Sequence, residues 1–409
     1  RSKCPRFGVD RMKVYLDMVT NQPHQSGRHF LQIPGPTNVP DRILRAIDGA
    51  TIDHRGPAFE RLAMRVLSGI KPIFQTSDPV LIYTASGTGA WEAALVNTLN
   101  PGDRVLMAET GQFSTLWRSL ANKLGLDVQF LSGDWRHGVR AADIAAALAK
   151  DTDYLIKAVC CVHNETSTGV TSDITAVRNV MDELRHPALL MVDTISSLAS
   201  IDYKHDEWGV DVTIGGSQKG LMLPPGLSFN AISNKALQIH ETAKMNRSYW
   251  DWTAMLAANK NGAFPYTPAT NLLYGLDEAI TILEEEGLKN VFRRHARLAE
   301  ATRRAVAAWG LETVAQVHSE ASNSLTAVML PDIHNADTFR AIVLERFNMS
   351  LGNGLGRLAG KVFRIGHLGA FNELMLAGTL SGVEMGLSAA GIPHEKGGVQ
   401  AALDYLSSS

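Results

Sequence analysis

The sequence predicts an α/β protein with a large, mostly parallel sheet and a smaller second domain. From Phe30 onward, short apolar runs alternate with longer helix-like segments, which is the pattern of parallel strands joined by helices. The chain has 409 residues, more than a single core usually accommodates, so we expect two domains. A long helical pattern begins at 267–286, and patterns typical of strands become rarer from there on. We therefore expect the boundary between the two domains in this region.

The large sheet is expected to contain seven strands. Each candidate is a short apolar run bounded by Gly, Pro, Asp or polar residues. A helix is predicted over 89–99, before Pro101 and Gly102. The candidate strands are 80–84, 104–108, 127–131, 158–162, 189–193, 210–214 and 228–232.

The C-terminal part reads as a smaller α+β domain. An amphipathic helix is predicted over 291–309, and strands over 324–330 and 361–365. We therefore expect a large domain with an N-terminal arm at 30–285 and a small domain at 286–409.

The first 29 residues are treated as an N-terminal extension whose native status is left open. Arg1 is not an initiator, so we expect either a trimmed chain or a fused or mis-started segment. Met12 and Met18 are the alternative starts.

Composition indicates a soluble cytoplasmic enzyme subunit. The net charge of -2 and the charged fraction of 20% give no sign of a nucleic-acid or membrane partner. No apolar run approaches the ~20 residues that cross a bilayer. The 3 cysteines are too few for a disulfide framework, and Cys160 and Cys161 are expected to be buried strand residues rather than nucleophiles.

The first chemical signal is Lys219, in the glycine-rich segment 215–220. Asp193 ends an apolar run upstream, so both side chains are expected at one edge of the sheet. A lysine and a buried carboxylate suit a pyridine cofactor, whose aldehyde binds the amine and whose ring nitrogen pairs with the acid. The alternative is a solvated turn lysine and an aspartate that caps a helix.

A second signal is the segment 84–92, where a strand opens into a helix through small residues. Glycines admit a ligand to the backbone, the first helical amides are unpaired, and Ser86 and Thr88 add hydroxyl groups. Gly87 and Gly89 lack the third glycine of a dinucleotide fingerprint, and the GK[ST] of a P-loop is absent. The segment therefore favours a phosphate site of another kind.

Other polar and aromatic residues follow neighbouring strands. Phe113 could stack on a flat cofactor or simply pack in the core. The segment 163–169 gathers several hydroxyl groups in one loop. His163 and Glu165 lack a third partner at ligand spacing, so no metal site is expected.

Arg364 lies inside a short predicted strand and needs an anionic partner there. Its planar guanidinium matches a carboxylate, so an amino-acid or oxo-acid substrate and a structural salt bridge are equal alternatives.

From Phe30 to the C-terminus, the chain resembles the class V, fold-type I pyridoxal-phosphate aminotransferases, and among them the serine-glyoxylate aminotransferases. The spacing of 26 residues from Asp193 to Lys219 is similar to the spacing in that family. The motifs that carry the resemblance are Pro34-Gly35-Pro36-Thr37, Ser86-Gly87-Thr88-Gly89, His163-Asn164-Glu165-Thr166, Asp193, Gly216-Ser217-Gln218-Lys219, Tyr266-Thr267-Pro268 and Phe363-Arg364-Ile365-Gly366.

The resemblance implies a role for each matching residue. Lys219 would bind pyridoxal 5'-phosphate covalently and shuttle a proton, Asp193 would hold the ring nitrogen protonated, and Arg364 would bind the substrate carboxylate. Thr267 would reach the phosphate of a neighbouring subunit, which implies a homodimer with a shared site, or a tetramer of such dimers. The remaining cofactor-binding residues would be Ser86, Gly87, Thr88, Phe113, Thr166, Gln218 and Tyr266.

The function that the resemblance implies is transfer of an amino group from L-serine to glyoxylate, giving hydroxypyruvate and glycine. Aspartate-glyoxylate and alanine-glyoxylate aminotransferases share the same motifs and remain alternatives. A pyridoxal-phosphate lyase or desulfurase is the alternative from another class, although a desulfurase needs a cysteine in a mobile loop. A nicotinamide-dependent oxidoreductase would leave Lys219 and Arg364 without roles.

Overall fold

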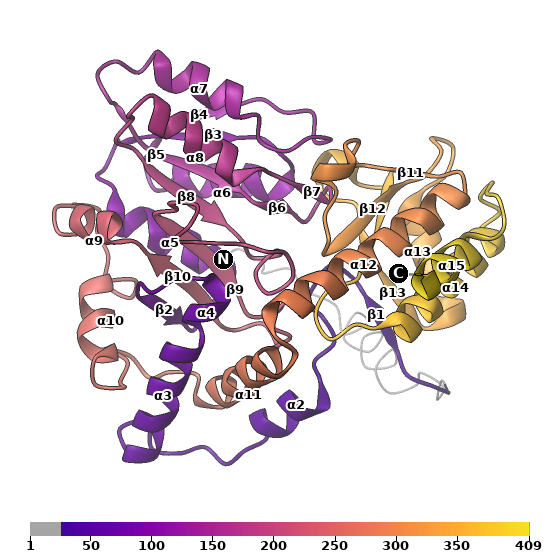
Figure 1. Cartoon of the computed structure of the whole chain (residues 1–409), viewed down its shortest axis with the longest axis horizontal. Coiled ribbons are helices and arrows are strands. Elements are labelled where there is room, and N and C mark those ends of the chain that lie inside the picture. The colour runs from indigo at the N-terminus through magenta and orange to yellow at the C-terminus, as the bar shows by residue number, and fades with distance from the viewer. Residues whose placement is uncertain (1–25, 409) are drawn as a thin grey trace, which may run out of the picture.

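A seven-stranded sheet forms the centre of the larger part of the molecule (Figure 1). The computed structural model describes residues 26–408, so most of the predicted extension at 1–29 lies outside the described residues. β10 is antiparallel to both of its neighbours, and the other pairs are parallel. In spatial order the strands are β2 (Val80–Tyr83), β10 (Ser228–Ile232), β9 (Val212–Gly216), β8 (Leu189–Asp193), β5 (Ile156–Val162), β3 (Arg104–Ala108) and β4 (Asp127–Leu131).

The predicted fold class is confirmed, and each of the seven predicted strands has a counterpart in this sheet. One prediction was wrong in its position, because the strand expected at 210–214 is β9 at Val212–Gly216. The amide of Val210 donates a hydrogen bond to the carbonyl oxygen of His205 in a turn. The Asp211 carboxylate accepts a hydrogen bond from the amide of Leu190 at 2.8 Å. β9 therefore starts later and runs into the glycines that precede Lys219.

Helices cover both faces of the seven-stranded sheet. In β8 alternate residues enter different cores: Leu189 and Met191 join one apolar cluster, Leu190 and Val192 the other. The first cluster includes α5 (Gly87–Thr98) and α6 (Gln112–Lys123), and the second includes α7 (Ala141–Ala149) and α8 (Ile174–Glu183). The remaining elements of this part are α2 (Asp41–Ile47), α3 (Pro57–Gly69), α4 (Lys71–Phe74), α9 (Asn234–His240), α10 (Trp252–Asn259), α11 (Thr270–Glu286) and the hairpin β6 (Asn164–Glu165) and β7 (Val170–Thr171).

A five-stranded sheet organises the other part, drawn in orange and yellow in Figure 1 except for β1, which is indigo. In spatial order it contains β1 (Phe30–Gln32), β13 (Met349–Asn353), β14 (Val362–Gly366), β12 (Leu325–Met329) and β11 (Glu312–Thr313). The strands predicted at 324–330 and 361–365 are confirmed as β12 and β14. The other elements here are α12 (Leu288–Ala308), α13 (Ala336–Phe347), α14 (Glu373–Ala389), α15 (Gly398–Ser408) and the 3-10 turns His318–Glu320 and Gly356–Leu358.

The N-terminal arm crosses between the two parts. The prediction assigned it to the large domain, but its strand β1 pairs in parallel with β13 of the five-stranded sheet. The domain boundary at 285/286 stays a prediction, and at this point Gly287 joins α11 to α12.

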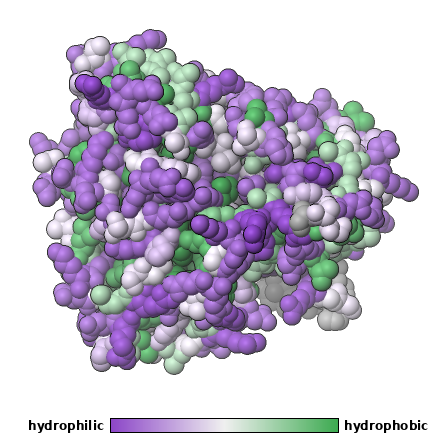
Figure 2. All heavy atoms as spheres, in the orientation of Figure 1, coloured by the Kyte–Doolittle hydropathy of each residue, from purple (hydrophilic) through white to green (hydrophobic). Residues whose placement is uncertain are grey.

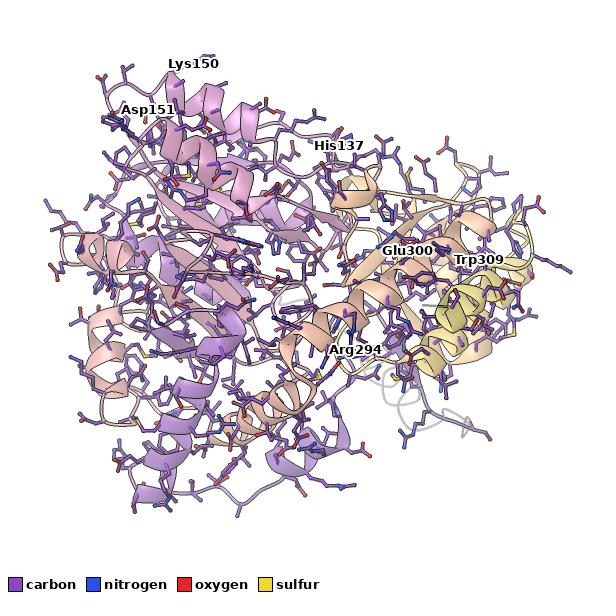
Figure 3. All side chains as sticks on the ribbon, viewed as in Figure 1. His137, Lys150, Asp151, Arg294, Glu300 and Trp309 are labelled. Atoms are coloured by element: carbon purple, nitrogen blue, oxygen red, sulfur yellow. The ribbon has the colours of Figure 1, made fainter. Side chains whose placement is uncertain are left out.

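Two groups of contacts hold the parts together. Arg294, which Figure 3 shows on α12, donates to Glu286 at the end of α11 and to the carbonyl oxygens of Gly369 and Phe371. Figure 3 also shows His137 on the side of the large part that faces the five-stranded sheet. The residue beside it, Arg136, donates to the carbonyl oxygen of Val314 at 3.0 Å.

Figure 2 shows hydrophilic residues spread over the visible face, with hydrophobic residues in separate small groups. Within residues 26–408, no helix has the length and apolar character needed to cross a membrane.

We expect Gly366→Ala to destabilise the protein, because a Cβ atom there would lie 2.2 Å from the carbonyl oxygen of Ile33. Overpacking of this kind costs about 1–3 kcal/mol. The control is Gly56→Ala, where the nearest atom would lie at an ordinary 3.4 Å. Denaturant unfolding measures both. Equal stability of the two variants would show that the arm does not pack on β14 as described.

Candidate active site

Lys219 lies in the turn after β9, buried beneath the N-terminal arm. Its side-chain amine donates a hydrogen bond to the carbonyl oxygen of Pro34. The amide of Thr37 donates to the carbonyl oxygen of Gln218 at 3.1 Å. Gly35 has a φ of +111°, and a Cβ atom there would lie 2.4 Å from Cδ of Lys219. Only glycine allows the arm to approach the lysine this closely. The arm therefore sets the position of Lys219.

Asp193 ends β8 beside this turn and is held by two donors. The amide of Ile195 donates to Oδ1 at 2.7 Å, and Nε1 of Trp91 donates to Oδ2 at 3.0 Å. Burial raises the pKa of Asp193 to about 7, against the opposite effect of these hydrogen bonds. A bound cation would favour the ionised carboxylate, so Asp193 suits a protonated ring nitrogen. The alternative of a helix cap is not observed, because 194–200 forms turns rather than a helix.

The amine of Lys219 is suited to nucleophilic chemistry. Burial and, to a smaller extent, the positive charge of Arg364 lower its pKa to about 7, while Asp193 acts in the opposite direction. The side chain is only 7% exposed, so the alternative of a solvated turn lysine is wrong. A large share of the amine is neutral near pH 7, as a nucleophile or base requires.

The side chain of Ile195 packs between the N-terminus of α5 and the glycines that lead into the Lys219 turn. A Cβ atom on Gly87 would lie 2.2 Å from Cδ1 of Ile195, and one on Gly216 would lie 3.2 Å from its Cγ2. Ser86 precedes the helix without a side-chain capping bond, and the amide of Gly89 donates to its carbonyl oxygen at 2.9 Å, so within residues 26–408 the amides of Gly87 and Thr88 are left for an anion.

Gln218 adds a polar group to this anion site. Its Oε1 is buried without a hydrogen-bond partner among residues 26–408. The two ends of a side-chain amide are assigned from their partners, so this end suits a donor to phosphate once a phosphate is present. Together with the α5 amides and the exposed hydroxyl-bearing residues Ser86 and Thr88, these residues fit a phosphate group.

Arg364 reaches the site from β14. Nε donates to the carbonyl oxygen of Asn353 and Nη1 to that of Thr166, both at 2.7 Å. Nη2 has no partner among residues 26–408, and no carboxylate there lies within salt-bridge distance of the guanidinium. Burial lowers the pKa of Arg364 to about 10, which leaves it charged at neutral pH. The structural salt bridge considered from the sequence is therefore not found in this part of the chain.

Glu165 organises the segment between Arg364 and Phe113, a role that the sequence analysis missed. Its buried carboxylate accepts from the amides of Phe113 and Ser114 at the start of α6, and from the Ser167 hydroxyl at 2.7 Å. It thereby ties the start of α6, which carries Phe113, to the loop that carries Thr166. A metal role is not supported for His163, whose Nδ1 lies 2.9 Å from the Ser197 hydroxyl.

Trp91 is a second residue that sequence reasoning missed. It is buried on α5 and looks like an ordinary core residue in the sequence, yet its indole donates to Asp193, which lies 102 residues away. No local pattern reveals such a contact.

Tyr266 and Thr267 lie apart from Lys219 in sequence but come to the end of β2. Both are exposed and line one pocket with Thr84, which leads into Ser86. The Tyr266 ring stacks on Tyr249 with 4.8 Å between centroids. Their predicted contact with a second subunit stays a prediction.

Comparison with known families decides between the remaining interpretations. The family model described as aminotransferase class-V matches residues 29–355. The chain belongs to the class-V aminotransferases. It is 49% identical over 387 residues to a serine-glyoxylate aminotransferase of Methylorubrum extorquens, covering 93% of this chain and 96% of that one.

Two further proteins are similar over nearly the full length. An L-aspartate-glyoxylate aminotransferase of Paracoccus denitrificans is 44% identical over 375 residues, covering 91% of this chain and 95% of that one. The crystal structure of pyridoxamine-pyruvate aminotransferase from Mesorhizobium loti matches with a TM-score of 0.88 and 25% identity, covering 95% of this chain and 99% of that one. This class-V aminotransferase is thus a transaminase, and its family and fold imply pyridoxal phosphate.

We expect Trp91→Phe to weaken cofactor retention in this class-V aminotransferase, because Asp193 loses its indole donor. A hydrogen bond to a charged group contributes about 1.5–3 kcal/mol, which corresponds to about tenfold to hundredfold in affinity. Equilibrium dialysis of pyridoxal phosphate measures the change. The control is Trp309→Phe, which removes an indole donor to Glu384 in the other part of the molecule. Retention that is equal in both variants would contradict the role given to Trp91.

The lowered pKa of Lys219 predicts how cofactor capture depends on pH. The amine is protonated below about pH 7 and neutral above it, so capture by the apoprotein should be about tenfold faster at pH 8 than at pH 6. Arg364→Leu removes a positive charge and should move the midpoint to higher pH. The exposed Arg346→Leu is the control. Stopped-flow absorbance gives the rates, and a midpoint near pH 10 in the unaltered protein would contradict the assignment.

Proposed function

We propose that this class-V aminotransferase transfers the amino group of L-serine to glyoxylate, giving hydroxypyruvate and glycine. The observation that carries the proposal is that Asp193 at the end of β8, Lys219 in the turn after β9 and Arg364 within β14 act on one another electrostatically, in a chain that is 49% identical to a serine-glyoxylate aminotransferase. Pyridoxal phosphate, when bound, supplies the carbonyl carbon that carries the amino group and a ring that withdraws electrons from the substrate.

The cofactor would be held at its two ends. Asp193 would pair with the ring nitrogen, and the free amides of α5, with Ser86, Thr88 and Gln218, would bind the phosphate. Phe113 would lie against the ring, and Thr166 beside its hydroxyl group. The buried, two-donor setting of Asp193 and the partnerless Gln218 Oε1 support this arrangement.

Lys219 and Arg364 would act on the substrate. Arg364 binds the α-carboxylate through the free end of its guanidinium, which orients the Cα–H bond. Lys219, as a neutral amine, would take the proton from Cα of the substrate and pass it to the cofactor carbon that carries the amino group. The burial of both residues excludes water from this step.

L-Serine is favoured over L-aspartate by a local pairing as well as by the relatives. The loop at Gly356 packs against Gln112 at the start of α6, and the next residue, Arg357, pairs with the buried Glu109 at 2.6 Å. This arginine therefore already has an anionic partner, and no contact within residues 26–408 brings it to Lys219 or Arg364. L-Aspartate and L-alanine remain the alternative donors, the first because of the relative in Paracoccus.

A desulfurase function is less well supported. Such an enzyme needs a mobile cysteine, whereas Cys160 and Cys161 are buried in β5, and Cys4 lies outside the described residues. A pyridoxal-phosphate lyase is distinguished by its products in the experiment below.

We also propose that the enzyme is a cytoplasmic homodimer with shared sites. The exposed Tyr266 and Thr267, close to the loop that leads to Ser86, support a contact between subunits at this place. The free buried cysteines in β5 are consistent with a reducing compartment. A tetramer built from such dimers is the alternative assembly.

The test is a donor series with the cofactor-loaded enzyme. L-Serine, L-aspartate and L-alanine are supplied separately with glyoxylate, and glycine and the oxo acid are quantified. We expect the highest kcat/KM with L-serine and no turnover in Lys219→Ala, whose folding is checked by circular dichroism. A higher kcat/KM with either other donor would overturn the choice of serine. Ammonia release without glycine would indicate a lyase.

A further inference from the structure

A group of three potential metal ligands lies at the other end of the sheet from Lys219. Asp78 precedes β2, and His205 and Asp206 precede β9, whereas Asp193 and Lys219 follow their strands. The ligand atoms of these three residues all lie within 4.8 Å of one another. The group has no part in the proposed transamination.

The histidine of this group is buried and lacks a partner on one side. Nδ1 of His205 lies 2.7 Å from the Thr213 hydroxyl, which orients the ring. Nε2 has no hydrogen-bond partner among residues 26–408, although the residue is 0% exposed. A buried ring nitrogen without a partner is unfavourable, and a ring nitrogen of His205 lies within 4.8 Å of an oxygen of each of two carboxylates that can share a cation with it.

The carboxylates retain capacity for a cation. Asp206 accepts hydrogen bonds from the Thr76 hydroxyl at 2.6 Å and from the Ser77 amide and hydroxyl at 2.9 and 3.2 Å, which leaves lone-pair capacity on Oδ1 for a cation. Asp78 makes no side-chain hydrogen bond within residues 26–408. The nearby Lys71 directs its amine to the carbonyl oxygen of Ser77 at 3.0 Å instead.

We propose that Asp78, His205 and Asp206 bind a divalent transition-metal cation, of which Zn²⁺ is the best match. An imidazole with two carboxylates is a donor set that suits Zn²⁺, with water as a fourth ligand on the exposed side at Asp206. Tetrahedral ligands at about 2.1 Å from zinc lie about 3.4 Å apart, so small side-chain rotations complete the site.

The cation would join two segments that already touch. The amide of His205 donates to the carbonyl oxygen of Phe74 at 3.1 Å, and that of Asp206 to Gln75 at 3.4 Å. These segments lead into β2 and β9, the two neighbours of β10 in the sheet (Figure 1). Binding to the folded state alone would stabilise this edge of the sheet.

The test uses tag-free, cofactor-loaded enzyme that has been treated with chelator. Isothermal titration with Zn²⁺ should show one site per chain, and Asp78→Asn should weaken it by at least about tenfold. Glu207→Gln is the control, because it removes a charge from the same exposed loop but no ligand of the group. Zn²⁺ should raise the unfolding temperature of the unaltered protein and of the control, but not of Asp78→Asn.

Three results would overturn the proposal. These are an unaltered protein that binds no Zn²⁺, an Asp78→Asn variant that binds it equally well, and a Glu207→Gln variant that loses as much affinity as Asp78→Asn. The His205→Gln variant is a second test if it folds, and it should also bind Zn²⁺ more weakly than the unaltered protein. Asp78→Asn is the decisive variant without it, since the Asp78 side chain makes no hydrogen bond to any residue in the range 26–408 that its loss would disturb.

Discussion

Burial of three ionisable side chains around one point is the constraint on which the rest of the site depends. Lys219, Asp193 and Arg364 each lie in a low-dielectric surrounding that disfavours charge, and this shifts the pKa of each group. Their neighbours compensate only in part. A cofactor with a cationic ring and an anionic phosphate, and a substrate with a carboxylate, would complete the charge pairing that residues 26–408 leave open.

The fold supplies this arrangement by bringing distant segments to one place. β8 delivers Asp193, β9 runs through its glycines into Lys219, and β14 of the other sheet delivers Arg364. The N-terminal arm then covers Lys219, while β1 pairs with β13 next to β14. The site therefore forms between the two sheets, and the arm connects them.

The sequence was most informative where a local pattern determines the structure. β8 was recognisable because a continuous apolar run suits a strand buried on both faces, and the helix after Ser86 because small residues precede it. The start of β9 was misplaced because Asp211 bonds to Leu190 across the sheet. The contacts of Trp91 with Asp193 and of Glu165 with α6 join residues 102 and about 50 apart, so local patterns could not show them. The role of Thr267 came from the family resemblance alone, and the resemblance chose between cofactor stacking and core packing for Phe113.

The assignment of the site depends on whether the buried amine of Lys219 is the one that binds the cofactor. Borohydride reduction of the loaded enzyme, followed by peptide mass spectrometry, tests it directly because reduction makes the bond to lysine permanent. We expect the cofactor mass on the peptide that contains Gln218-Lys219-Gly220 and nowhere else. Labelling of a different lysine, or of none after loading, would contradict the assignment of the site.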